Sequence, residues 1–176
     1  ERGATARRRP IRSAVFADSP HRVVATVAGR DLNGVRYEPI FPNAVDAGGS
    51  AAAWTVVPAD FVTAADGTGV VHTAVMYGED DYQLGENVGL PQQHTVGLDG
   101  NFLPHVVGLA GRYVKAQETE TAIYDHLKRT GAFFRTAPYT HDYPFCWRCE
   151  TPLLYYAKDS WFIAMTKIKR ELLKNA

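Results

Sequence analysis

The feature that most limits how this chain can fold is a series of short apolar runs, each closed by residues that favour turns. In the middle of the chain the runs cover residues 53–57, 61–64 and 70–74, with Pro, Asp and Gly between them. Runs of this length between turn residues predict adjacent strands rather than long helices. We therefore expect the middle of the chain to be built from β structure.

The rest of the chain follows the same pattern, with a few helical stretches between the predicted strands. Asp99-Gly100 predicts a hairpin, because this pair tolerates the positive φ of tight two-residue turns. Because strands come first and helices are short, we predict an α+β, mostly β fold and no doubly wound sheet. The other predicted elements are a strand at 22–28, a loop at 39–53, β segments at 132–135, 153–157 and 161–165, and helices at 79–88, 117–129 and 167–174.

Composition narrows the class of protein. The chain has 176 residues, 45% of them hydrophobic and 22% charged, which is enough to form a globular core. Its 19 basic and 19 acidic residues cancel, so no overall field attracts nucleic acid or an anionic membrane. With no apolar run of roughly 18 residues and no signal-peptide core, we expect a cytoplasmic protein without membrane contact. A start at Glu1 rather than Met predicts a piece of a longer protein.

The segment 66–82, DGTGVVHTAVMYGEDDY, is the richest in groups that can do chemistry. His72 lies on a predicted strand, and Asp81 lies nine residues later, beside Asp80, at the start of a predicted helix. A histidine and a carboxylate could face one pocket if the turn between them doubles back. The alternative is a half-buried structural histidine and acids that cap a helix. On the residues alone this second reading has the greater weight.

Cys146 and Cys149 are the only cysteines, and they form a single C-x-x-C motif. This spacing fits half of a tetrahedral zinc site, for which His141 is the only nearby candidate for a further ligand. A redox role is disfavoured, because no thioredoxin-like βαβ unit surrounds the pair. Weak zinc binding and two structural thiols without a metal remain equally open.

A long resemblance to a known family adds to these readings. The segments GTGVVHTA and GEDDYQLGENVGLP closely resemble the editing domain of isoleucyl-tRNA synthetases. The resemblance includes LNGVRYEPIFP, VVPADFVTAADGTG and THDYPFCWRCETPLLYYAKDSWFIAMTKIKRELL, and covers most of residues 31–174. Valyl- and leucyl-tRNA synthetases, which share this domain, match the flanking segments less well. The resemblance implies an incomplete editing domain with a barrel-like β core over 1–135, then a connective segment over 136–176 that leads to an absent catalytic core.

The resemblance also implies roles for individual residues. Asp81 would receive the α-amino group of a wrongly attached amino acid, and His72 would lie beside the side chain and ester of the substrate. Thr68, Gly69 and Asp80 would support substrate binding. The implied substrate is the acceptor end of tRNA(Ile) carrying valine, which the parent enzyme hydrolyses after it has joined amino acid and tRNA with ATP and Mg.

Several departures from the family pattern limit what this chain is expected to do alone. Val75 stands where the family usually has proline, and the threonine-rich Trp-Thr-Thr-x-Pro-Trp-Thr strand, which forms the opposite pocket wall, has no counterpart. The two ATP-binding signatures of the family are also absent, so ATP and Mg are expected only in the parent. The partner C-P-x-C motif is absent too, which leaves Cys146 and Cys149 as half a zinc knuckle.

We therefore expect weak deacylation, or none, from the chain alone, and we expect it to be a monomer. A non-catalytic module that holds the acceptor end of tRNA, or another protein, is the alternative from a different functional class. An unrelated zinc-ribbon protein is a third possibility. It would have to bind zinc in stoichiometric amount without a partner knuckle.

Overall fold

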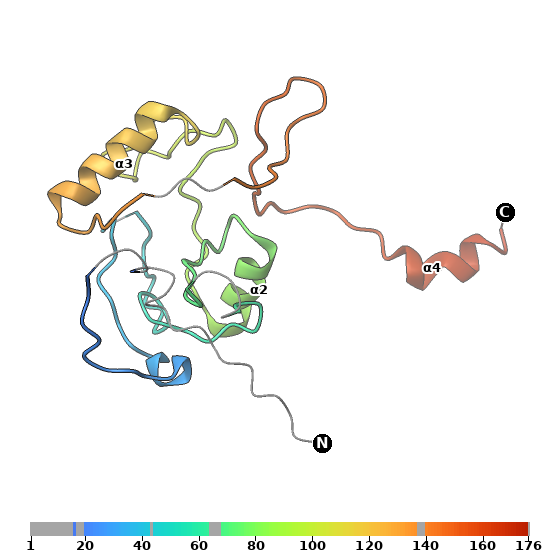
Figure 1. Cartoon of the computed structure of the whole chain (residues 1–176). Helices are drawn as coiled ribbons and strands as arrows, with labels where there is room; N and C mark the ends of the chain where they lie inside the picture. The colour runs from blue at the N-terminus through green and yellow to red at the C-terminus, as the bar shows by residue number, and fades with distance from the viewer. Residues whose placement is uncertain (1–15, 17–19, 43, 64–67, 137–139, 176) are drawn as a thin grey trace, which may run out of the picture.

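The computed structural model describes residues 16, 20–42, 44–63, 68–136 and 140–175, in which four helical elements are joined by irregular chain (Figure 1). Within these residues no helix packs against another. In Figure 1, α4 lies far from α2 and α3 at the end of a long segment. The elements are η1 (Gly29–Leu32), α2 (Glu79–Val88), α3 (Gln117–Arg129) and α4 (Met165–Leu172).

The β pairing of the described residues consists of isolated antiparallel bridges rather than ladders. The strands predicted at 22–28 and 70–74 are not assigned as strands, and of the run 53–57 only Thr55 forms a bridge. Apolar runs predict which side of a strand is buried, but a strand also needs a neighbour that supplies its hydrogen bonds. The mostly β class and its barrel-like core remain predictions. The bridges are Arg36–Thr55, Val96–Phe102, Asn101–Tyr113 and Phe145–Pro152.

The β segments predicted in the second half of the chain also do not form strands where the structure describes them. Residues 132–135 and 153–157 carry no strand, and the segment 161–165 ends in the first residue of α4. The last residue of the run 61–64 and the turn residues Asp66 and Gly67 lie outside the described residues.

The helix predicted over residues 79–88 is confirmed as α2. Three acidic residues fill its first turn, where they complement the positive end of the helix. Gly89 ends the helix with φ 73°, a left-handed conformation that glycine adopts most readily. Gly85 is the buried residue of this helix, and a Cβ there would lie 2.6 Å from Val75 Cγ1. The side chain of Val75 therefore packs directly on the backbone of α2.

The hairpin predicted around Asp99-Gly100 is also confirmed. Gly97 N–H donates to Asn101 O at 2.8 Å, and Gly100, with φ 78°, donates to Gly97 O at 3.0 Å. This is a three-residue loop with a left-handed glycine rather than a two-residue turn. The Asn101 backbone N–H, and then its side-chain amide, hold the pKa of Asp99 below its ordinary value.

The helix predicted over 117–129 is confirmed as α3, and a buried threonine attaches it to the hairpin. Thr119 is only 1% exposed, and its hydroxyl donates to Tyr113 O at 2.7 Å. Tyr113 in turn forms the bridge with Asn101. After the helix, Gly131 has φ 74°, a left-handed conformation that glycine adopts readily. Among the described residues, the buried apolar side chains are Ala53, Val96, Val106 and Leu109.

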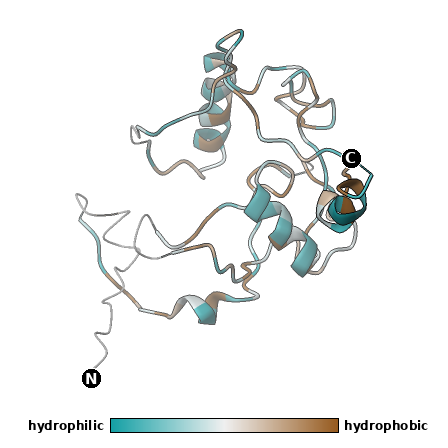
Figure 2. Ribbon diagram, turned by 90° about the vertical axis from the view of Figure 1, so that its right-hand side faces the viewer, coloured by the Kyte–Doolittle hydropathy of each residue, from teal (hydrophilic) through white to brown (hydrophobic). Residues whose placement is uncertain are grey.

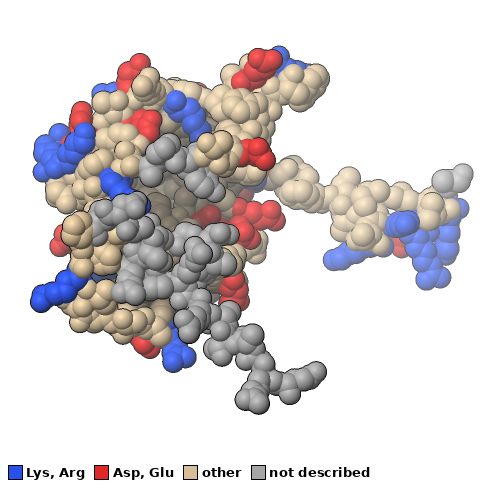
Figure 3. Space-filling view, in the orientation of Figure 1, with Lys and Arg blue, Asp and Glu red and all other residues tan. Residues whose placement is uncertain are grey.

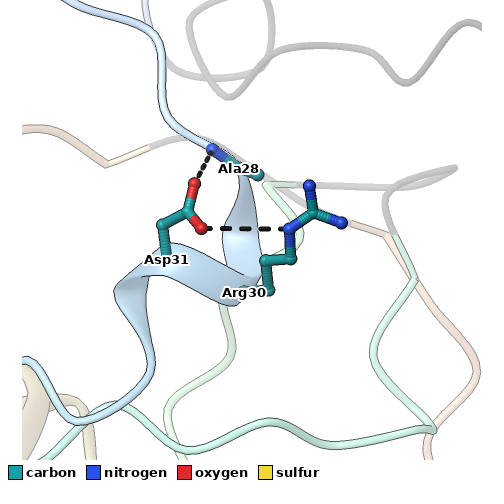
Figure 4. A network of polar contacts seen from close by, with 3 residues as sticks. All are labelled: Ala28, Arg30 and Asp31. Atoms are coloured by element: carbon teal, nitrogen blue, oxygen red, sulfur yellow. Dashed lines mark hydrogen bonds and ion pairs between the residues drawn. The ribbon is translucent and has the colours of Figure 1, made fainter.

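Near the start of the described chain, η1 forms directly after the segment that was predicted as a strand at 22–28. The Asp31 carboxylate accepts a hydrogen bond from Ala28 N–H at 3.2 Å, which closes this short helix (Figure 4). The ion pair between Arg30 Nε and Asp31 Oδ1 spans 3.8 Å between exposed side chains. Such surface pairs contribute little to stability, so the capping bond is the more important contact.

The last helix begins two residues earlier than the predicted 167–174 and ends at Leu172. Apolar residues recur at helical spacing in α4, at Met165, Ile168 and Leu172. Figure 2 shows both hydrophobic residues (brown) and hydrophilic residues (teal) in this helix. Basic side chains gather on α4 in Figure 3. Among the described residues, no helix combines the length and the apolar character that crossing a bilayer requires.

Replacing Thr119 with valine tests the link between α3 and the hairpin. Thr119→Val keeps the shape of the side chain but removes the bond to Tyr113 O, and we expect the free energy of unfolding to fall by about 1 kcal/mol. Thr121→Val is the matched control, because its hydroxyl bonds Gln117 O within the same helix at an exposed position. Urea denaturation measures both changes. Equal losses would contradict a special role for Thr119.

Candidate functional site

A large open groove collects three of the residues that the sequence predicts for substrate binding. It has a volume of about 1980 Å³, and Thr68, Gly69 and His72 line it. The body of the molecule is hollowed on the face seen in Figure 3. The groove continues along the chain from His72 to Tyr77, so the turn that follows the histidine also forms part of its wall.

The first part of this wall is a turn shaped by Thr68 and Gly69. The Thr68 hydroxyl donates to Val70 O at 2.9 Å and accepts from Val70 N–H at 3.1 Å. Gly69 has φ 73°, which an L side chain rarely adopts. The turn directs the chain toward His72, whose side chain is exposed. The Thr68 hydroxyl is thus engaged with its own turn.

Asp81 reaches this wall from the first turn of α2. Its carboxylate oxygen Oδ1 accepts a hydrogen bond from Ala74 N–H at 3.0 Å, and Ala74 lines the groove. Its other oxygen, Oδ2, lies over Gly78, where an added Cβ would overlap it. Since a carboxylate has about four lone-pair positions, Asp81 keeps capacity for a further donor. The neighbouring Asp80 is exposed.

The predicted residues are therefore only partly brought together. Thr68, Gly69 and His72 share the groove wall, whereas Asp80 and Asp81 are not among the described residues that line it. Asp81 is connected to the wall through Ala74, two residues after His72. The assignment of these five residues to one substrate site stays a prediction.

Cys146 and Cys149 lie on a tight hairpin closed by the Phe145–Pro152 bridge. Within it, Cys146 N–H donates to Thr151 O at 2.9 Å and Glu150 N–H donates to Cys146 O at 2.8 Å. Glu150 takes the left-handed conformation with φ 55°. Both thiols are free, and Cys149 is exposed.

Thr151 changes the chemistry of this hairpin. Its hydroxyl lies 3.0 Å from Cys149 Sγ, and this contact lowers the pKa of the Cys149 thiol, followed by contributions from the Thr151 backbone and the Cys146 side chain. Hydrogen bonds to the thiolate favour the charged form, which is the form that binds metals.

Two thiolates on one turn fit half of a tetrahedral zinc site. Across the described residues, no group of three or more His, Cys, Asp or Glu side chains could hold a metal ion. A complete site would need ligands from elsewhere, and the half zinc knuckle stays a prediction.

Three residues that were not predicted as site residues shape the turn before Asp81 and the cysteine hairpin. Gly78 leaves room for the Asp81 carboxylate, Thr151 contacts Cys149, and the Tyr77 hydroxyl accepts from Thr95 N–H at 2.7 Å. The glycine could have been noticed, because it immediately precedes the acidic helix start. The contacts of Tyr77 depend on residues 18 positions away and have no local signal.

Comparison with known proteins gives long matches, although no family model matches the chain. The isoleucine–tRNA ligase of Clostridium novyi is 42% identical over 158 residues, which is 90% of this chain. That of Clostridium acetobutylicum is 40% identical over the same share, and that of Bdellovibrio bacteriovorus is 41% identical over 93% of the chain. The chain spans only about 15% of the length of each relative.

These matches relate the chain to the aminoacyl-tRNA synthetases. Within that class it belongs to the isoleucine–tRNA ligases, as the counterpart of one segment of these longer proteins. The resemblance to isoleucyl-tRNA synthetases stated from the sequence motifs is thereby confirmed, and the assignment to their editing domain stays a prediction.

Alkylation can test the contact between Thr151 and Cys149. Because the Thr151 hydroxyl favours the thiolate, Thr151→Val should raise the pKa of Cys149 and move its rate profile with iodoacetamide to higher pH. Trypsin cleaves after Arg148 and so separates the two cysteines for mass spectrometry. Thr140→Val, at an exposed position before the hairpin, is the control. An unchanged Cys149 profile in Thr151→Val would refute the contact.

Proposed function

We propose that this chain is the part of an isoleucine–tRNA ligase that hydrolyses valine wrongly attached to tRNA(Ile). The parent protein would join isoleucine to tRNA(Ile) with ATP and Mg. The observation that carries the proposal is the Asp81 carboxylate, held by Ala74 N–H beside a groove that His72 lines. The relatives, which are isoleucine–tRNA ligases, support the parent reaction.

A fixed carboxylate suits this substrate because an amino acid in ester linkage keeps a free ammonium group. Asp81 would bind that ammonium by a charge-assisted hydrogen bond and leave the ester carbon open to water. The bond from Ala74 limits the freedom of the carboxylate before substrate arrives. Asp81 would therefore position the substrate rather than attack it.

His72 is the other group for which we propose a direct role. Its imidazole lies on the groove wall and is exposed, so it is accessible to a ligand. A neutral imidazole there can orient a water molecule or hydrogen-bond the ribose of the terminal adenosine. Either role is compatible with the exclusion of isoleucine and the admission of valine.

The size of the groove supports a macromolecular substrate. Small-molecule pockets enclose roughly 300–1,000 Å³, whereas this groove has about 1980 Å³. A free amino acid would leave most of it empty, while the acceptor end of tRNA would fill more.

Editing answers a limit on specificity for which isoleucyl-tRNA synthetase is itself the established example. One missing methylene distinguishes valine from isoleucine by only about 1–3 kcal/mol of binding free energy, so a second, hydrolytic selection is needed.

Zinc would belong to the parent protein, with Cys146 and Cys149 as two of its ligands.

A non-catalytic module that holds the tRNA acceptor end, or another protein, is the second candidate. It is favoured by one observation: Asp81 already accepts a backbone hydrogen bond and does not itself line the groove. In that case the carboxylate would stabilise the turn, and the groove would bind a partner without hydrolysis.

Removing the Asp81 carboxylate from the isoleucine–tRNA ligase that carries this segment tests the proposal. Loss of a charge-assisted bond worth about 1.5–3 kcal/mol should lower release of valine from valyl-tRNA(Ile) by roughly 10- to 100-fold in Asp81→Ala. Glu79→Ala, which removes an exposed acid from the same helical turn, should leave the rate unchanged. If Asp81→Ala hydrolyses normally, Asp81 does not bind the substrate as proposed. If the unmutated ligase binds the tRNA without releasing valine, the second candidate is favoured.

Gly78→Ala offers an independent test that keeps the carboxylate. The backbone at Gly78 has φ −155°, which any residue adopts, so the added methyl group should only displace the Asp81 side chain. We expect deacylation to fall toward the level of Asp81→Ala, with little change in melting temperature. Gly97→Ala is matched, because its Cβ would lie 2.8 Å from the Asp99 carboxylate instead. Equal rates in the two glycine variants would contradict the placement of Asp81.

A further inference from the structure

The hydroxyl group of Tyr77 is a hydrogen-bonding centre that joins two distant parts of the chain. It accepts from Thr95 N–H at 2.7 Å and from Val96 N–H at 2.9 Å, and it lies 3.2 Å from the Thr95 hydroxyl. Val96 is among the most buried apolar residues of the described chain. Tyr77 is thus attached to a buried part of the described chain.

The ring of Tyr77 belongs to a cluster that also contains His94 and Tyr156. His94 stacks on Tyr156 with ring centres 4.1 Å apart and planes 7° apart, and Tyr77 lies edge-on to both rings at 5.9 Å. Tyr156 donates its hydroxyl hydrogen to Val96 O at 3.1 Å. Burial, and then the proximity of Tyr77, raise the pKa of Tyr156.

This ring cluster brings the chain that follows the cysteine hairpin against the groove wall. Ala157 N–H donates to Met76 O at 2.9 Å, directly beside Tyr77. In Figure 1 the orange hairpin segment returns toward the green region that contains α2. The groove wall at 74–77 is therefore held from both the hairpin at Asp99-Gly100 and the segment near Tyr156.

Tyr77 lies on the turn that separates His72 from Asp81. Its N–H donates to Ala74 O at 2.8 Å, while Ala74 N–H donates to the Asp81 carboxylate at 3.0 Å. The C=O group of Ala74 thus bonds Tyr77, and the N–H group of the same residue bonds Asp81. The conformation of the turn, and with it the direction of the Ala74 N–H group, depends on where Tyr77 is anchored.

We propose that Tyr77 is a positioning residue for Asp81, and that its hydroxyl fixes the turn whose Ala74 amide holds the carboxylate. This inference rests on the proposed editing function and deepens it, because the ammonium of the substrate would meet an oxygen whose position Tyr77 sets. The role proposed for Tyr77 is to position Asp81, not to react with the substrate. Its ring and its hydroxyl have separate tasks, since the ring packs in the cluster and the hydroxyl anchors the turn.

Hydrogen exchange of this chain, followed by NMR, tests the proposal without any measurement of activity. Tyr77→Phe keeps the ring and removes the hydroxyl, so the Thr95 and Val96 amides should exchange faster. Positioning further requires that the Ala74 amide lose protection about fivefold, as expected for one weakened hydrogen bond. Tyr143→Phe is the matched control, because it removes a single hydroxyl bond to Leu153 O outside the ring cluster.

Amides of α3 provide the internal reference for global stability. Faster exchange at Ala74, Thr95 and Val96 with unchanged exchange in α3 supports the proposal. Faster exchange at Thr95 and Val96 alone overturns it, because Tyr77 would then anchor the hairpin without affecting the Asp81 turn. Uniform loss of protection, including α3, also overturns it and assigns Tyr77 a purely structural role.

Kinetic measurements on variants of the parent ligase separate this inference from the proposed function. Tyr77→Phe should lower kcat/KM for deacylation of valyl-tRNA(Ile) about fivefold, while Tyr143→Phe leaves it unchanged. Unchanged deacylation in Tyr77→Phe together with a strong defect in Asp81→Ala overturns the positioning role alone. Unchanged deacylation in Asp81→Ala overturns the assignment of editing to the Asp81 site, whereas the exchange of Ala74 still reports whether Tyr77 holds the turn.

Discussion

The hydrogen bond from Ala74 N–H to the Asp81 carboxylate is the contact on which the candidate site depends. It joins the groove wall to the first turn of α2, so the chain between them must double back within seven residues. Gly78 makes this possible, because no side chain occupies the place of Oδ2. A carboxylate in a first turn ordinarily complements the positive end of its helix, and here it also accepts a donor from the wall. The same contact can therefore serve helix stability and ligand binding.

How much the sequence predicted depends on how local the signal was. The helix α2 and the loop at Asp99-Gly100 follow from acids, glycines and spacing within a few residues, and they form as predicted. The strand at 70–74 needed a partner strand, and apolar residues do not say which partner is present. The helix α4 begins and ends two residues earlier than predicted.

The candidate site was predictable in its members and not in its geometry. His72 and Asp81 were evident from residue type and from the motifs around them, and the groove does contain His72. That Asp81 would bond Ala74, and that Tyr77 would bond Thr95 and Val96, could not be read from spacing. Such contacts depend on side-chain directions and on tertiary packing, which a single sequence does not contain.

Val75, which stands where the family usually has proline, shows that the turn at residues 74–77 tolerates a substitution at this position. Proline lacks an N–H donor, and among the backbone bonds of the described residues none uses the N–H of Val75. A valine in place of the usual proline therefore alters none of these bonds. Its side chain instead fills the space over Gly85, where a Cβ would lie 2.6 Å from Val75 Cγ1. Since the Ala74 amide, the Tyr77 amide and the Tyr77 hydroxyl carry the hydrogen bonds of this turn, the turn can keep its shape while position 75 varies.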